Sequence, residues 1–177
     1  MMLVRLERAI NRFSDLLGTI SAVLFLIMLV NVFIDVVLRY ALNVVYIGSQ
    51  EMEWHLFAAM FMLAVPYTLR AEGHVRVDLV YERLSMPKKN CIDIAGGLLL
   101  LLPFCLLVGY YGIGFAHEAW ELGETSGDPG GLPARWIIKS VIPVAFFATA
   151  ISGVGMILTS INELRGVKHE HHKEAAL

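Results

Sequence analysis

The sequence predicts an all-α integral membrane protein with four transmembrane helices, and three observations lead to this prediction. Of the 177 residues, 57% are hydrophobic and only 17% are charged, whereas a soluble domain carries about 25% charged residues. The apolar residues lie in four long runs, and the charges gather between them. A run of about 20 apolar residues crosses a bilayer as a helix. We therefore expect one membrane domain, residues 1–177.

The four spans are expected at about residues 16–38, 54–69, 92–116 and 136–161. Pro103 and Pro143 lie inside the third and fourth spans. Each removes a backbone donor, so each should kink its helix.

Two further segments are expected to form amphipathic helices that lie flat in the membrane interface. In the first, the apolar residues at helical spacing are Leu3, Leu6, Ile10, Phe13 and Leu17, with Arg5, Arg8 and Arg12 off this stripe. In the second, which follows span two, the apolar face consists of Val77, Val80, Tyr81 and Leu84. The polar final segment, residues 168–177, is expected to be disordered.

The orientation of the chain follows from its basic residues. Eleven of the 14 Lys and Arg residues fall in the N-terminal tail, the connection between spans two and three, and the C-terminal tail. By the positive-inside rule these segments are cytoplasmic, so both termini are expected there. Trp54, Trp120 and Trp136 all fall at the expected outer interface, where indole rings anchor.

Asn31, Asp35 and Arg39 are spaced four apart and share one face of the first span. If Arg39 sits at the outer interface, Asp35 lies ~6 Å deeper and Asn31 ~12 Å deeper. One interpretation is a proton or ion site. The other, which we favour, is a polar stripe that faces another protein helix.

The outer face is acidic. Its carboxylates are Glu51, Glu53, Glu118, Glu121, Glu124 and Asp128. Singly, each is typical of a solvated rim, but as a set they could orient a docking partner electrostatically.

His55 and His117 fall near the outer ends of their spans. Two facing histidines could ligate a b-type haem, although interfacial histidines are common and nothing else in the sequence points to haem. The sequence has no Walker A loop, no catalytic triad and no zinc motif, and no strong charge lies in the middle of spans two to four. Secondary transporters usually build their site from broken helices in repeated halves, which four unrepeated spans lack. These residues predict an accessory or scaffold subunit and not an enzyme.

Several motifs, in order along the chain, resemble one family. The exit of span two reads Pro66-Tyr67-Thr68-Leu69-Arg70 and is followed by His74-Val75-Arg76-Val77-Asp78. Glu51 and Glu53 precede span two, and Trp136-Ile137-Ile138-Lys139 with Ile142-Pro143 opens span four. With these motifs the chain resembles, over nearly its whole length, the small Q-type (DctQ-like) membrane subunit of tripartite ATP-independent periplasmic (TRAP) transporters.

The resemblance implies a multi-pass protein of a bacterial inner membrane with two protein partners. A periplasmic binding protein captures an organic anion, usually a carboxylate, and a large membrane subunit moves it with a sodium gradient. The small subunit, in contact with phospholipid, would hold the large one, and needs no cofactor or nucleic acid; sodium ions are expected in the large subunit. Arg70 would complement the helix dipole and contact headgroups, while His74 and Asp78 would fix the corner after span two.

Two alternatives remain open at this point. One is a small proton-coupled exporter that works as a homodimer with Asp35 as its carboxylate. The other is a haem-bearing membrane anchor of a redox complex.

Overall fold

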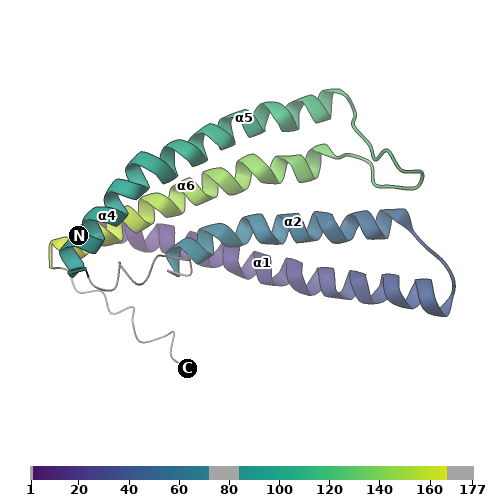
Figure 1. The fold of residues 1–177 in the computed structure, drawn as a ribbon, viewed down its shortest axis with the longest axis horizontal. Helices are drawn as coiled ribbons and strands as arrows, with labels where there is room; N and C mark the ends of the chain where they lie inside the picture. The colour runs from purple at the N-terminus through teal and green to yellow at the C-terminus, as the bar shows by residue number, and fades with distance from the viewer. Residues whose placement is uncertain (1, 72–83, 167–177) are drawn as a thin grey trace.

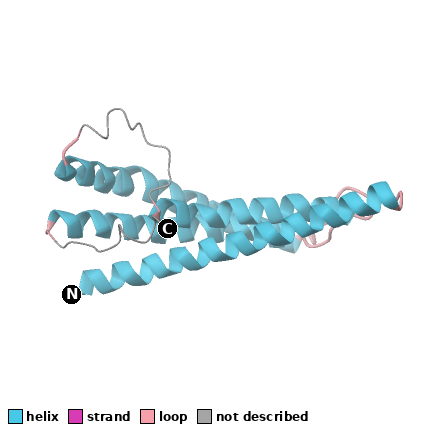
Figure 2. Cartoon of the chain, turned by 90° about the horizontal axis from the view of Figure 1, so that it is seen from below, coloured by secondary structure: helices cyan, strands magenta, loops and turns pink. Residues whose placement is uncertain are grey.

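The structure is a computed structural model, and it describes residues 2–71 and 84–166. All regular structure in these ranges is helical (Figure 1, Figure 2). The helices are α1 (Met2–Ala41), α2 (Ile47–Arg70), α4 (Met86–Gly96), α5 (Leu102–Glu121) and α6 (Trp136–Leu164), with a π-helical turn, η1 (Gly97–Leu101), between α4 and α5. His74, Asp78, most of the expected flat helix after span two, and the tail 168–177 lie outside the described residues.

The helices form two hairpins side by side. Residues 42–46 connect α1 to α2, and residues 122–135 connect α5 to α6 (Figure 1). These connections lie at one end of the bundle, here called the hairpin end. The start of α1, the end of α2, α4 and the end of α6 lie at the other, here called the N-terminal end.

The central helix is α6, which contacts α1, α2, α4 and α5. Over their most apolar stretches, 56% of the α6 residues are buried, against 11% in α1 and 11% in the helix that runs from Met86 to Glu121. The outward surfaces of α1 and α5 are therefore largely apolar, as a lipid environment requires.

Three helices of the described ranges are long and apolar enough to cross a membrane: Leu3–Ala41, Met86–Glu121 and Trp136–Leu164. They contain the expected spans 16–38, 92–116 and 136–161. The expected span 54–69 lies in α2, which has 24 residues but is not in this group. Polar residues in its first turns, with Glu51 and Glu53 among them, shorten its apolar stretch.

The N-terminal segment is helical, as its spacing predicts, but it is not a separate element. It runs without a break into the first span, giving a helix of 40 residues, about 60 Å long. Its apolar stripe was expected to face the membrane interface, and for Ile10 and Leu17 this is wrong because both are buried. Gly155 of α6 lets Ile10 approach closely: a Cβ at Gly155 would lie 2.7 Å from Ile10 Cγ2.

The prolines have different local consequences. The π-helical turn η1 ends just before Pro103, and such a turn relieves the clash between a proline ring and the preceding helix. Pro143 lies within α6, which continues as one helix on both sides. Gly112 of α5 lies against Pro143, where a Cβ would be 3.2 Å from its Cδ, so the two helices pack closely at this point.

Candidate functional site at the two ends of the bundle

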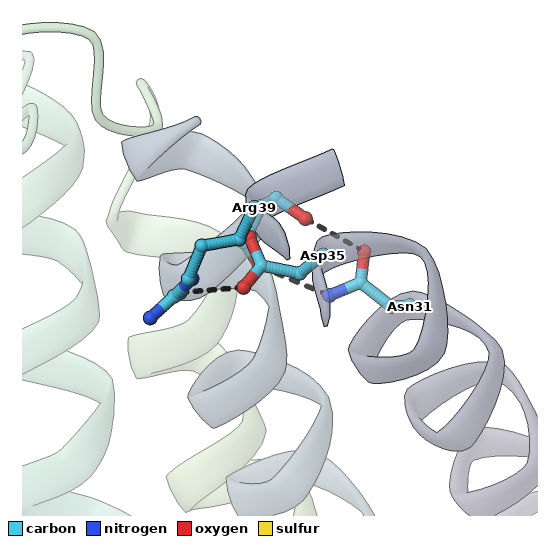
Figure 3. A network of polar contacts seen from close by, with 4 residues as sticks. Asn31, Asp35 and Arg39 are labelled. Carbon is cyan, nitrogen blue, oxygen red and sulfur yellow. Dashed lines mark hydrogen bonds and ion pairs between the residues drawn. The ribbon is translucent and has the colours of Figure 1, made fainter. Parts of the chain in front are cut away.

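The polar stripe of α1 lies at the hairpin end and faces α2 of the same chain (Figure 3). Asn31 Nδ2 donates a hydrogen bond to the Ser49 carbonyl at 2.9 Å, and Ser49 Oγ donates to Asn31 Oδ1 at 3.3 Å. Arg39 Nη2 donates to Asp35 Oδ2 at 2.5 Å. Asp35 is only 3% exposed, so its pairing with Arg39 is what offsets the desolvation of the carboxylate. Asn31 thus ties α1 to α2 near the hairpin end, while Asp35 and Arg39 pair within α1.

Glu51 lies in the second turn of α2 and is buried. It accepts hydrogen bonds from Ser126 Oγ and, at 2.6 Å, from the Leu132 backbone N–H. Arg135 Nη2 lies 3.9 Å from the same carboxylate. The hydrogen bonds from Ser126 and Leu132 hold the pKa of Glu51 below its ordinary value. Glu51 thus ties the 122–135 connection to α2, and its burial removes it from the expected exposed rim.

The other five residues of the expected acidic rim divide into two groups. Glu118, Glu121 and Asp128 are exposed, and His117 Nε2 lies 3.2 Å from Glu121 Oε1. Glu124 pairs with Lys139, and Glu53 is half-buried. The freely accessible acidic surface is therefore smaller than the sequence predicted.

The three tryptophans all lie at the hairpin end. The sequence predicted that they share one end of the bundle. Trp120 and Trp136 meet edge to face with ring centroids 4.7 Å apart. The Arg135 guanidinium lies 5.6 Å from the Trp54 ring centroid, and Trp54 stacks on His55. His55 and His117 thus contact different side chains, Trp54 and Glu121. Within the described ranges, no group of three or more His, Cys, Asp or Glu side chains could hold a metal ion.

A buried carboxylate that the sequence interpretation missed lies at the N-terminal end. Glu7 of α1 is 2% exposed. Thr159 Oγ1 donates to Glu7 Oε1 at 2.8 Å, and Asn162 Nδ2 donates to Glu7 Oε2 at 2.6 Å. About two turns closer to the hairpin end on the same two helices, the hydroxyls of Ser14 and Ser152 share a hydrogen bond of 2.7 Å. These polar contacts join α1 to α6.

The signal for this contact was present in the sequence. The buried residues of α1 in this region repeat at alternating spacings of three and four: Glu7, Ile10, Ser14, Leu17 and Ser21. This is the spacing of a coiled-coil seam. Because three of its five members are polar, the seam is not visible when only apolar residues are followed.

Arg70, the last residue of α2, pairs with Asp15 of α1. One turn earlier in α2, Tyr67 packs on Gly18, where a Cβ would lie 2.6 Å from Tyr67 Cγ. The end of α2 is thus anchored on α1 immediately before the corner that sequence analysis assigned to Arg70, His74 and Asp78.

The sequence of the chain matches a known protein family. The family model for the DctQ component of tripartite ATP-independent periplasmic transporters matches residues 28–163. The match spans the last part of α1, all of α2, α4 and α5, and nearly all of α6. Comparison with curated proteins gave no match.

Proposed function

Because the chain belongs to the DctQ family of TRAP transporter components, as its motifs predicted, we propose that it is the small, non-catalytic membrane subunit of such a transporter. Its task is to hold a large permease subunit in the membrane. The large subunit carries out sodium-coupled uptake of an organic anion, a carboxylate, that a periplasmic binding protein delivers. Sodium sites and solute specificity then belong to the other chains.

The observation that carries this proposal is the use of the three buried carboxylates in the described ranges. Glu7 links α1 to α6, Asp35 pairs with Arg39, and Glu51 links α2 to the 122–135 connection. Each is engaged within the chain, which suits a static support. A carrier needs ionisable groups that can exchange their partners for a solute or an ion.

The proposal includes α2 as a fourth span, with both termini in the cytoplasm of a bacterium and the helices in its inner membrane. In support, α2 packs against both α1 and α6, and the charged residues Glu51 and Arg70 toward its two ends have partners within the chain. The charge distribution along the sequence supports the orientation. With a hydrocarbon core of about 30 Å, the first turns of α1 would extend to the cytoplasmic surface.

A proton-coupled exporter is the weaker alternative. Such a protein would use Asp35 as its proton carrier, yet this carboxylate is buried and bonded to Arg39. Among the described residues, the two histidines of the haem-bearing alternative contact other side chains, His55 the Trp54 ring and His117 the Glu121 carboxylate.

Reconstitution in liposomes tests the proposal. The chain alone should take up no carboxylate and move no protons. Together with the large subunit and the binding protein, it should support uptake that depends on a sodium gradient. Transport by the chain alone would overturn the proposal, as would full uptake by the other two components without it.

A further inference from the structure

Two tyrosines on the outer surface of α5 lie far from both ends of the helix. Tyr110 is 70% exposed and Tyr111 is 69% exposed. Their rings meet edge to face, with centroids 5.5 Å apart. Tyr110 lies roughly 16 Å along the helix from Glu121 and roughly 21 Å from Gly96. Counted from Ala116, the outer end of the expected span, Tyr110 lies roughly 9 Å inside the hydrocarbon core.

The hydroxyl groups of these tyrosines lack a partner among the residues that the structure describes. Lipid tails offer no hydrogen-bond acceptor, so a hydroxyl that faces them is unfavourable. Lysine and arginine side chains near helix ends can extend to the interface. The side chains of a helix point back toward its N-terminus, which for Tyr110 and Tyr111 of α5 is away from the nearer end of the span. The two hydroxyls therefore call for an acceptor from another protein.

A notch lies beside the tyrosines. Gly114 follows Tyr110 by four residues and Tyr111 by three, so all three share a face of α5. A Cβ at Gly114 would meet nothing within 4 Å. A glycine flanked by large side chains lets a second helix approach closely. We call the surface formed by Leu107, Tyr110, Tyr111 and Gly114 the tyrosine face.

The outer surface of α1 has a different character. Between positions 16 and 37 its exposed large side chains are all hydrocarbon: Leu16, Ile20, Val23, Phe25, Leu26, Ile27, Leu29, Val30, Phe33, Ile34, Val36 and Val37. Its exposed hydroxyl, Thr19 Oγ1, donates to the Asp15 carbonyl at 3.0 Å and is satisfied within the helix. This surface suits lipid, whereas the tyrosine face does not.

We propose that the tyrosine face is the docking surface for a transmembrane helix of the large permease subunit. That helix offers acceptor oxygens to the hydroxyls of Tyr110 and Tyr111 and places an apolar side chain beside Gly114. The inference rests on the proposed function and adds to it the surface through which the two subunits meet.

The charge next to the tyrosine face favours this occupant over a second copy of the chain. Glu118 follows Gly114 by four residues and is exposed. Two copies inserted in the same direction would be related by a two-fold axis along the membrane normal. The two Glu118 side chains would then meet at the same depth, and like charges repel there. A different partner with a basic or hydrogen-bonding residue at this depth avoids the repulsion.

Photo-crosslinking in the assembled transporter tests the surface directly. A benzophenone amino acid replaces Tyr111 in one variant. In the matched control it replaces Phe33, an α1 residue that is 68% exposed. On irradiation, position 111 should form an adduct with the large subunit and position 33 should not. An adduct of position 111 with a second copy of this chain, or with lipid alone, would overturn the proposal.

Substitutions provide a second test. Gly114→Leu places its Cβ where nothing lies within 4 Å in the isolated chain, and leucine is a better helix former than glycine. It should reduce the large subunit that co-purifies by about tenfold, because overpacking disrupts a fitted contact. Tyr110→Phe and Tyr111→Phe should each reduce it by about threefold, which is typical for one hydrogen bond between membrane helices.

The controls are Tyr40→Phe, a tyrosine at the end of α1 that is 79% exposed, and Val30→Phe on the lipid-facing surface of α1. Both should leave co-purification unchanged. If the wild-type chain binds the large subunit and Gly114→Leu binds it equally well, the tyrosine face is refuted while the proposed function stands. If the wild-type chain does not bind the large subunit at all, both fail.

Discussion

Glu7 and Asn162 lie at opposite ends of the chain, yet Asn162 Nδ2 donates a hydrogen bond of 2.6 Å to the Glu7 carboxylate. The carboxylate is buried where α1 crosses the last turns of α6. Thr159 donates to its other oxygen. This contact and the Ser14–Ser152 bond hold the first turns of α1 on the central helix, so the static framework proposed above depends on polar contacts at this end.

Glu7→Ala should therefore destabilise the isolated protein in detergent. The change deprives the Asn162 amide of its acceptor in a buried position, which costs about 1–3 kcal/mol. Thr159 is less affected, since its hydroxyl also reaches the Gly155 carbonyl at 3.2 Å. Thermal unfolding followed by circular dichroism measures the loss. Arg8→Ala, at an exposed neighbour, is the control and should stay within about 0.5 kcal/mol of wild type; equal stability of the two variants would contradict the role of Glu7.

Gly155→Val should push α1 away from α6 at the point where Gly155 faces Ile10. A Cβ at this position would lie 2.7 Å from Ile10 Cγ2, so α1 must shift, at a cost of about 1–3 kcal/mol. A spin label on each helix would report the change as a longer distance between α1 and α6. The control is Gly114→Val, where a Cβ meets nothing within 4 Å. An unchanged distance in Gly155→Val would show that the helices do not meet through this glycine.

These contacts also show what sequence alone could predict. Hydropathy located the three strongest spans, and the positions of Trp54, Trp120 and Trp136 predicted that they share one end. Following apolar residues alone placed the N-terminal stripe in the interface, because the polar seam members Glu7 and Ser14 do not appear in an apolar pattern. Polar residues can occupy a helix–helix seam when the facing helix carries their partners, and those partners lie 138 and 155 residues away in sequence.

The burial of Glu51 has the same physical origin. Its position before a span is typical of a solvated carboxylate, which is why it was assigned to the rim. The donors that bury it, Ser126 and Leu132, come from a connection of turn-forming residues. No periodicity in the sequence marks which carboxylate such a connection folds against.

The 122–135 connection should loosen at acid pH because of Glu51. Hydrogen bonds from Ser126 and Leu132 lower the pKa of this carboxyl below its ordinary value of 4.5. The stabilisation is therefore fully present above that value and is lost as the pH falls through the lower folded-state pKa. Hydrogen exchange at the Leu132 amide, which donates to Glu51, should accelerate over this window after correction for intrinsic rates.

Glu51→Gln is the matching variant for this pH effect. A neutral amide cannot titrate, so exchange at Leu132 should be faster than in wild type at pH 7 and show no extra acceleration in acid. Glu53→Gln changes a half-buried carboxylate two residues further along α2. It should keep the wild-type pH dependence of exchange at Leu132. The same acid response in Glu51→Gln and wild type would assign it to another group.

Asp35→Ala separates a structural role from an ion-binding one. The change removes the partner of Arg39 at the hairpin end. Arg39 is partly exposed, so it can be rehydrated, and the loss of stability should be about 1 kcal/mol or less. In the reconstituted transporter, the sodium concentration for half-maximal uptake should stay the same, because the Asp35–Arg39 pair lies within α1. Intact co-purification with lost sodium dependence would instead identify Asp35 as an ion-coupling residue.

Reversing the exposed acidic charges at the hairpin end should weaken productive docking of the binding protein. The variant Glu121→Lys, Asp128→Lys changes two exposed carboxylates and leaves Glu51, which holds the connection, in place. Steering by exposed charges is screened over about 8 Å at physiological salt, so the loss of uptake rate should be several-fold at low salt and small at high salt. The control, Arg5→Glu with Arg8→Glu, reverses exposed charges at the N-terminal end and should leave the salt dependence of uptake unchanged. Identical uptake by the acidic-face variant and wild type at every ionic strength would exclude this surface from docking.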